Sequence, residues 1–307
     1  MQSLTVGVVA VAVSDTAGIR LFVGGHAYRV QGELACLYGD RCFSAVHEPP
    51  RVYSRPDGVV GLLDSGAFSD PIDQRLTPEQ ALCRQLAWEE RASQLWGGPW
   101  QASYLVSYDL LIDEVWTGTT RTKRRWSRAD AEWAVRETVA AAAYLASQRG
   151  AIVPRVPVLS VQGVDAEQYA DCAQQVLRYA VPGDWIGLGG WCILGRWQSW
   201  LPEFGQAMRL VLPMVAAAGI THVHLFGVLW EPALGGILWL ADQYGITVST
   251  DSTAPLLAAA GKNHVKSGAR CPYWRDNVAW WRARLANLRT SRWYRPLPAW
   301  QRRLWVA

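Results

Sequence analysis

The segment VPVLSVQGVDAEQYADCAQQVLRYAVPGDWIGLGG, residues 156–190, contains the pattern that decides the fold. Its two ends, 156–163 and 184–190, are short apolar runs rich in Val, Ile and Leu, as buried parallel strands are. Residues 165–178 between them are typical of a helix. A strand, a helix and a second strand in this order form the repeating unit of a parallel α/β fold.

The same unit recurs on both sides of this segment. We expect further strands at residues 59–65, 103–109, 221–228 and 245–251. We expect further helices at residues 77–95, 127–149, 204–218 and 234–244. The first of these helices opens with Thr77 as N-cap and Pro78 at its first position, and Gly150, Gly219 and Gly245 follow the other three. Two more strands could lie in the first 50 residues or after Asp251.

The residues at the ends of the expected strands favour a closed barrel over an open sheet. Nearly every strand ends in Asp, Gln-Gly, Gly-Gly or Phe-Gly. In a barrel these ends converge on one mouth, where the active site lies, whereas in an open sheet they would form a row. The sequence therefore predicts an α/β fold, a (β/α)8 TIM barrel. We expect a β-rich N-terminal segment at residues 1–50, the catalytic barrel at 51–260 and a basic, Trp-rich helical cap at 261–307.

The composition is that of a soluble globular protein. Half of the 307 residues are apolar, which is ample for one large domain. No window of about 18 apolar residues lacks a charge, so we expect no membrane span. Six scattered cysteines without a C-x-x-C pair argue against a disulfide framework and a closed zinc site, and favour the cytoplasm. The excess of Trp, 18 against 5 Phe, leaves core packing and base stacking open.

Three aspartates follow expected strands and should meet at the barrel mouth. Asp64 stands in GLLDSGAF, Asp109 ends SYLVSYD, and Asp251 stands in GITVSTDSTAP. The small residues after Asp64, beginning with Ser65, would let a ligand approach the backbone closely, and Phe68 would offer a ring face. The alternative for each aspartate is an ordinary role in capping a turn.

An amide followed by a glycine, and a pair of glycines, complete the expected rim. Gln162 and Gly163 end one strand, and Gly189 and Gly190 end the next. An amide can donate to a ligand carbonyl, and paired glycines let backbone N–H groups touch a planar ligand. The glycines do not form a phosphate loop, because no G-x-G-x-x-G opens a helix and no G-K-[ST] follows.

Two histidines, His222 and His224, alternate on one expected strand. No acid or Cys stands beside them in a metal-ligand pattern, which favours a core or pore-lining position. We therefore expect no metal site and no cofactor.

Positive charge gathers in two segments, although the net charge is only +4. Residues 255–307 hold 11 Lys or Arg and one acid, so the remainder of the chain is net negative. RTKRRWSR, residues 121–128, holds five cations in eight positions, for which a solvated approach to a helix is the alternative to a phosphate clamp. Cations interleaved with Trp suit a nucleic acid. The candidate contacts to its backbone are Arg121, Lys123, Arg124, Arg125, Lys262, Lys266 and Arg270.

Taken in order, these motifs resemble the tRNA-guanine transglycosylase superfamily over residues 61–255. DSGAF looks like the family's D-S-G-G-F, and SVQG, GLGG, HLFGV and TDSTAP match later barrel motifs in the same order. The resemblance implies that Asp251 is the nucleophile at the sugar's anomeric carbon. It implies that Asp64 first protonates the leaving guanine and then deprotonates the incoming base. The groups that would bind the base are Asp109, Gln162, Gly190 and Phe68.

Departures from the tRNA enzymes favour a DNA substrate. Those enzymes carry C-x-C-x-x-C and a distal His as a zinc site, whereas here only Cys271 follows the nucleophile strand, with His264 before it. The chain looks more like the small 7-deazaguanine DNA transglycosylases, which exchange guanine in DNA for a base such as 7-cyano-7-deazaguanine. Arg196 stands near the place of the Glu that faces an aminomethyl ammonium in the bacterial tRNA enzymes, which favours a neutral substituent.

The partners that follow are DNA and a 7-deazaguanine base, without a membrane and with a homodimer or a helper protein left open. The same chemistry on tRNA is one alternative. A catalytically idle, nucleic-acid-binding partner subunit is another, and the presence of Asp64 and Asp251 argues against it.

Overall fold

The structure is a computed structural model that describes residues 18–24, 29–30, 33–34, 39–50, 58–70, 74–110, 114–117, 120–123, 128–191, 200–255 and 274–298. Eight parallel strands form a closed barrel in the order β1-β12-β11-β10-β9-β6-β5-β4. Their bounds are β1 Arg20–Gly24, β4 Asp40–Ser44, β5 Val60–Asp64, β6 Tyr104–Val106, β9 Val156–Val161, β10 Trp185–Leu188, β11 His222–Leu225 and β12 Thr247–Ser252. The predicted TIM barrel is thus confirmed.

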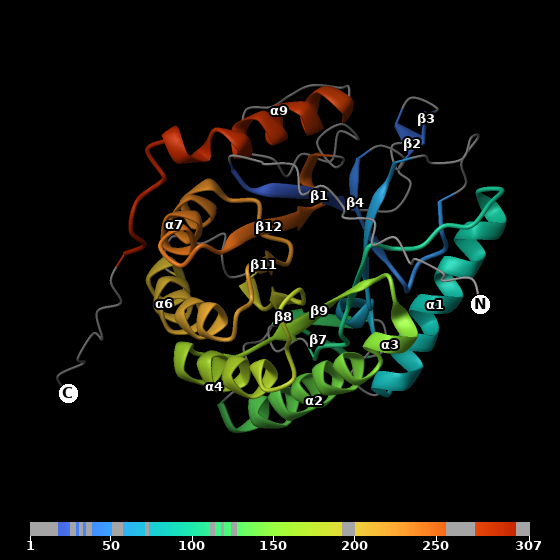
Figure 1. Cartoon of the computed structure of the whole chain (residues 1–307), viewed down its shortest axis with the longest axis horizontal. Helices are drawn as coiled ribbons and strands as arrows, with labels where there is room; N and C mark the ends of the chain where they lie inside the picture. Colours follow the sequence, from blue (N-terminus) through green and yellow to red (C-terminus); the bar gives the residue numbers. More distant parts are fainter. Residues whose placement is uncertain are drawn as a thin grey trace, which may run out of the picture.

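Helices surround the strands, as Figure 1 shows. They are α1 Pro78–Leu95, α2 Arg128–Ser147, α3 Arg149–Ile152, α4 Ala166–Leu177, α6 Leu201–Ala217, α7 Glu231–Asp242 and α9 Trp274–Ala286, with the short 3-10 turns η1 Ala67–Ser69 and η4 Leu288–Thr290. Two antiparallel hairpins stand outside the barrel sheet: β2 Arg29–Val30 with β3 Glu33–Leu34, and β7 Glu114–Thr117 with β8 Thr120–Lys123. Throughout the described residues, each helix falls short of the length and apolar character that crossing a bilayer requires.

Two barrel strands come from the first 50 residues. β1 pairs with both β12 and β4, and this closes the barrel. The boundary expected at residue 50 therefore falls inside the barrel, which begins at Arg20. The apolar pattern hides these strands because β1 begins with Arg20 and β4 begins with Asp40 and Arg41, so neither is a continuous apolar run.

Local sequence signals set most helix ends. The hydroxyl of Thr77 accepts from Gln80 N–H at 3.2 Å while the Gln80 side chain accepts from Thr77 N–H at 2.9 Å, a capping box that starts α1. Gly219 and Gly245 follow α6 and α7 with φ of 74° and 65°, as C-terminal glycines do. The stop expected at Gly150 is wrong, because Gly150 lies inside α3, which continues until the buried Ile152.

Two large apolar regions form most of the core. The larger one lies between the strands and the helices, and the smaller one fills the barrel with Phe22, Leu62, Tyr104, Val106, Val158 and Trp185. Much of the Trp excess belongs to the larger region: Trp88 and Trp96 are buried, and their rings lie against each other and against Trp100. Core packing therefore accounts for these Trp residues.

Candidate functional site

The three predicted aspartates lie at the carboxyl-terminal rim of the barrel. Asp64 is the last residue of β5, Asp251 lies near the end of β12, and Asp109 follows β6 by three residues. β5 and β6 are neighbours, while β1 and β4 separate β5 from β12. Each side chain remains partly accessible. The rim therefore presents carboxylates from well-separated parts of the sequence to one space, as in barrel enzymes.

Asp64 has the electrostatics of a group that can exchange a proton at neutral pH. Burial raises its pKa to about 7, and repulsion from Asp109 and Asp251 adds to the shift. A hydrogen bond from Gly66 N–H and the charge of Arg84 oppose it. Asp109 and Asp251 are therefore close enough to Asp64 for their charges to affect it. A carboxyl group with a pKa near 7 holds a proton in part of the population and can act as a general acid or base.

Asp251 is held by one of its oxygens. Gly227 N–H donates to Asp251 Oδ1 at 2.8 Å, and His224 Nε2 lies 3.2 Å from the same oxygen. Both contacts fall on the same carboxylate oxygen. Gly24 lies beside the second oxygen: a Cβ there would be 3.6 Å from Asp251 Oδ2, an ordinary van der Waals contact. Asp251 is therefore oriented by Oδ1, with Oδ2 left to act.

Asp109 and Gln162 form a pair. Gln162 Nε2 donates to Asp109 Oδ2, while burial is the main cause that raises the pKa of Asp109. Gln162 Oε1 is buried and has no hydrogen-bond partner among the described residues. Such an unpaired buried acceptor is costly unless something binds it. Gly189 is packed on this amide, since a Cβ at Gly189 would collide with the Gln162 side chain.

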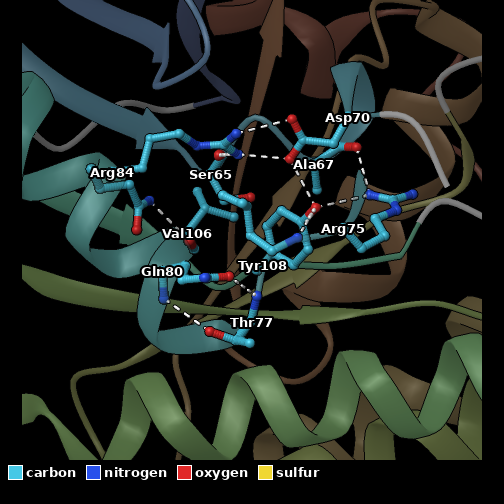
Figure 2. Close-up of polar contacts among 11 residues, drawn as sticks. Ser65, Ala67, Asp70, Arg75, Thr77, Gln80, Arg84, Val106 and Tyr108 are labelled. Atoms are coloured by element: carbon cyan, nitrogen blue, oxygen red, sulfur yellow. Dashed lines mark hydrogen bonds and ion pairs between the residues drawn. The ribbon is translucent and has the colours of Figure 1, made fainter. Parts of the chain in front are cut away.

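A polar network holds the segment after Asp64 (Figure 2). Arg84 donates to both oxygens of Asp70 at 2.9 Å and also to Ser65 O. Tyr108 Oη donates to Asp70 at 2.8 Å, and Arg75 lies within reach of that hydroxyl at 3.4 Å. Tyr108 directly precedes Asp109, so the network links two rim carboxylates through their neighbours. Arg75 also lowers the pKa of Asp109 through its charge.

Four other predicted rim residues occupy different environments. Ser65 is buried, with an Oγ that has no partner in the described part of the chain. Phe68 is half-buried in η1, on the segment that the network holds. Gly163 touches the start of α4, where a Cβ would meet Tyr169 N, which gives this glycine a packing function. Gly190 has φ of 81°, a conformation that favours glycine.

Sequence reasoning missed three rim groups. Phe226 is half-buried inside the barrel, and Gly187 makes room for it, because a Cβ there would lie 2.6 Å from the ring. Gly227 and His224 hold Asp251. The alternation of two His on β11 and of Phe226 just after it, beside Thr, Ser and Asp on β12, was the available signal, because alternate residues of a barrel strand point inward.

The basic segments are only partly described. Arg121 and Lys123 lie on β8, in a hairpin inserted between the carboxyl end of β6 and α2. Arg124, Arg125, Lys262, Lys266 and Arg270 lie outside the described residues, as do Arg196, His264 and Cys271.

The expected C-terminal helix exists as α9, but two of the tail's cations pair with α7. Arg284 bonds Glu231 at 2.6 Å, and Arg289 bonds Asp242 at 2.6 Å.

The Arg284–Glu231 ion pair borders a surface groove of about 570 Å³ between α7, α9 and η4, which includes Trp280 and Trp293. Arg284 lies 4.9 Å from the Trp280 ring centroid, and Arg292 lies 4.4 Å from that of Trp293. Trp281, by contrast, is buried. Part of the basic, Trp-rich tail therefore attaches α9 to the barrel, and part of it remains at the surface.

The rim combines a carboxyl group that exchanges a proton near pH 7 with a second carboxylate oriented by two donors. This pairing suits displacement at a sugar carbon, with one group as acid and base and the other as nucleophile. Within the described residues, no group of three His, Cys, Asp or Glu side chains could hold a metal ion. No protein-family model matches the chain, and no curated protein matches it.

Proposed function

We propose that the protein is a DNA guanine transglycosylase, which exchanges guanine in DNA for a 7-deazaguanine base through a covalent aspartyl-glycosyl intermediate. The observation that carries the proposal is the division of the rim carboxylates into two environments. Asp64 has a pKa of about 7, whereas Asp251 accepts two hydrogen bonds on one oxygen. The motif order DSGAF, SVQG, GLGG, HLFGV and TDSTAP, which resembles the transglycosylase superfamily, supports the same conclusion.

In the first half-reaction, Asp251 Oδ2 attacks the anomeric carbon of the target nucleotide. The bond from that carbon to the guanine nitrogen breaks, and protonated Asp64 gives its proton to the departing base. In the second half-reaction, Asp64 takes a proton from the incoming 7-deazaguanine, whose nitrogen attacks the anomeric carbon. The ester bond breaks and Asp251 is restored. The sugar keeps its configuration because two displacements occur, as in retaining glycosidases.

The base would be bound by the groups around Asp109. The two carboxylate oxygens of Asp109 can accept from the amidine edge of guanine, and Gln162 would donate to the guanine oxygen. Because Gln162 Nε2 donates to Asp109, this amide has one N–H left for a ligand. Phe68 and Phe226 supply aromatic faces at the rim. The target nucleotide has to leave the base stack to reach this space.

The substrate assignment rests on what the sequence contains. The chain lacks the zinc-ligand pattern of the tRNA enzymes, which favours DNA, and Arg121 and Lys123 of the β7–β8 hairpin supply cations for its backbone. Arg196 favours an incoming base without an ammonium group, such as the nitrile.

Incorporation of radiolabelled guanine into plasmid DNA and into total tRNA tests the proposal. The test variant is Asp251→Ala. The matched control is Glu90→Gln, which changes an exposed carboxylate on α1. We expect incorporation into DNA, loss of at least about 10³-fold in Asp251→Ala and wild-type activity in Glu90→Gln. Denaturing gels should trap a protein–DNA adduct that Asp251→Ala lacks. Incorporation into tRNA alone would transfer the proposal to RNA, and nucleic-acid binding without any exchange would make the chain an idle partner subunit.

A further inference from the structure

A continuous chain of polar side chains runs through the inside of the barrel to Asp251. His222 and His224 of β11 stand directly opposite Thr247 and Ser249 of β12 in the sheet register. Thr247 is exposed at the amino-terminal end of β12, whereas His224 and Ser249 are fully buried. The side chains therefore form a path from the surface at the floor of the barrel to its rim. These five residues, Asp251 included, are called the relay below.

The contacts along the relay are all within hydrogen-bonding distance. Thr247 Oγ1 lies 2.6 Å from His222 Nδ1, and His222 Nε2 lies 2.7 Å from Ser249 Oγ. Ser249 Oγ lies 2.8 Å from His224 Nδ1, and His224 Nε2 lies 3.2 Å from Asp251 Oδ1. Each member contacts the next one, and each except Asp251 can donate or accept at its linking atom.

Because the pKa of His222 lies well below its usual range, His222 is taken as neutral, and counting protons along the relay then gives two consistent arrangements. Asp251 as a carboxylate only accepts, so His224 Nε2 carries a proton in both. In the first arrangement, Thr247 donates to Thr221 O, at 2.9 Å. His222 Nδ1–H then donates to Thr247, Ser249 donates to His222 Nε2, and His224 Nδ1–H donates to Ser249. His224 is thereby doubly protonated and positively charged.

In the second arrangement, every hydrogen bond of the relay has its donor and acceptor exchanged, except the one from His224 to Asp251. Thr247 donates to His222 Nδ1, His222 Nε2–H donates to Ser249, and Ser249 donates to His224 Nδ1, so that both histidines are neutral. Thr221 O keeps a partner, because Thr247 N–H also donates to it at 2.9 Å. The second arrangement holds one proton fewer than the first. Moving one hydrogen along each of the first three links, and releasing one from Thr247, converts the first arrangement into the second.

Aromatic rings surround the two histidines of the relay, so these links are the route along which the proton can move. The His222 ring stacks on Trp185 with centroids 3.5 Å apart, and the His224 ring lies 5.7 Å from Phe22 and 4.9 Å from Phe226. Burial, His224 and Arg20 lower the pKa of His222 well below its usual range, so His222 rests in its neutral form. The other titratable groups facing this region are Arg20 with Asp40, Cys42, Asp64 and Tyr104.

We infer that the relay is a proton path that lets His224 change its charge when Asp251 does, which makes His224 and Ser249 positioning residues for the nucleophile. The inference rests on the proposed function for the direction of events. When Asp251 attacks, its carboxylate becomes a neutral ester and no longer offsets a charge on His224. His224 Nδ1 then passes its proton to Ser249, Ser249 passes one to His222, His222 passes one to Thr247, and Thr247 releases one to water. Cleavage of the ester reverses each transfer.

The decisive measurement does not depend on catalysis. Imidazole ¹⁵N shifts of the full-length protein, labelled in its five histidines, report the protonation of each ring nitrogen. His222→Gln and His224→Gln assign the signals. We expect a proton on His224 Nδ1 in a larger share of wild-type molecules than of Asp251→Asn molecules, because the variant mimics the uncharged ester and leaves His224 with a proton on Nε2 alone. The same His224 protonation in both proteins between pH 5 and 8 would overturn the inference, whatever the protein catalyses.

A kinetic arm separates proton transfer from mere orientation. His224→Gln keeps a donor toward Asp251 but cannot pass a proton, and Ser249→Ala interrupts the relay between the histidines. We expect both to slow adduct formation on the order of 10-fold, with KM unchanged and with the pH dependence altered, while His47→Gln matches the wild type. Full activity in His224→Gln together with a loss in His224→Ala would assign His224 to orientation alone and would contradict the relay. Thermal unfolding of each variant verifies that it is folded.

Discussion

The two ends of the barrel interior treat charge in opposite ways. At the floor, Arg20 donates to both oxygens of Asp40 at 2.9 and 2.6 Å and to Tyr104 Oη at 3.2 Å. At the rim, by contrast, none of the three carboxylates forms an ion pair with Lys or Arg within the described residues. The ion pair at the floor joins β1 to β4, whereas burial and repulsion between neighbouring carboxylates at the rim raise the pKa of Asp64. Stability and chemistry are therefore assigned to opposite ends of the same strands.

The strongest way to test this division is Asp64→Asn at the rim. Loss of the acid and base should lower kcat/KM by about 10²- to 10⁴-fold. In the wild type, kcat/KM should fall as the pH rises through about 7, because the free enzyme then loses the proton on Asp64. A base-exchange assay across pH 5–9 measures both effects. An intact basic limb in Asp64→Asn would assign that titration to another group.

The same variant should be more stable than the wild type above neutral pH. The pKa of Asp64 is raised to about 7 in the folded state from 3.8, so the stability present below pH 4 is lost as the pH rises through 7. An amide cannot ionise, and the variant should therefore gain about 1–2 kcal/mol at pH 8 and little at pH 4. Urea unfolding at the two pH values gives the difference. If Asp64→Asn and the wild type were equally stable at both pH values, ionisation of Asp64 would not lower the free energy of unfolding.

Arg20→Met tests the floor. It leaves Asp40 and the hydroxyl of Tyr104 without their partner, and we expect it to lower the free energy of unfolding by about 1–3 kcal/mol. Its effect on kcat/KM at 25 °C should be far smaller than that of Asp64→Asn, since Arg20 lies at the opposite end of the strands. Comparing urea midpoints with exchange rates checks this expectation. A loss in kcat/KM that, converted to free energy, exceeds the loss in the free energy of unfolding would contradict the contrast between the two ends.

The smallest effect is expected for Tyr108→Phe, which affects the rim indirectly. The change removes the hydroxyl that donates to Asp70 at 2.8 Å and loosens the segment between Asp64 and Phe68. We expect KM to rise about threefold and the free energy of unfolding to fall by about 1 kcal/mol. Tyr144→Phe on α2 serves as the matched control in steady-state kinetics. A change in kcat alone would instead place Tyr108 in the chemical step.

The sequence predicted the apolar strands and missed the polar ones, for a physical reason. Strands such as β9 are buried on both faces and appear as continuous apolar runs, and β9 itself was recognised within two residues. β1 and β4 place Arg20 and Asp40 at the floor, and their charges pair with each other across two strands. An ion pair between neighbouring strands makes polar side chains suitable inside a barrel, but a single strand does not reveal its partner.

The candidate site shows the same limit. Asp64, Asp109 and Asp251 could be predicted because each follows an apolar run. The relay could not, because it depends on the register that sets His224 opposite Ser249, 25 residues later in the chain. The pairing of Arg284 with Glu231, 53 residues apart, escaped prediction in the same way, and those cations appeared available for a nucleic acid.

The pairing of β1 with β12 has a consequence for biosynthesis. Arg20 of β1 stands beside Ser249 of β12, so a ribosome has to release more than 200 residues between the two strands before they can meet. Gly18 packs against Leu285 of α9, which emerges later still. Contacts this distant in sequence form slowly and leave strand edges exposed until they do. The nascent chain therefore stays an open sheet, with Asp251 yet to join Asp64, until translation of the barrel is nearly complete.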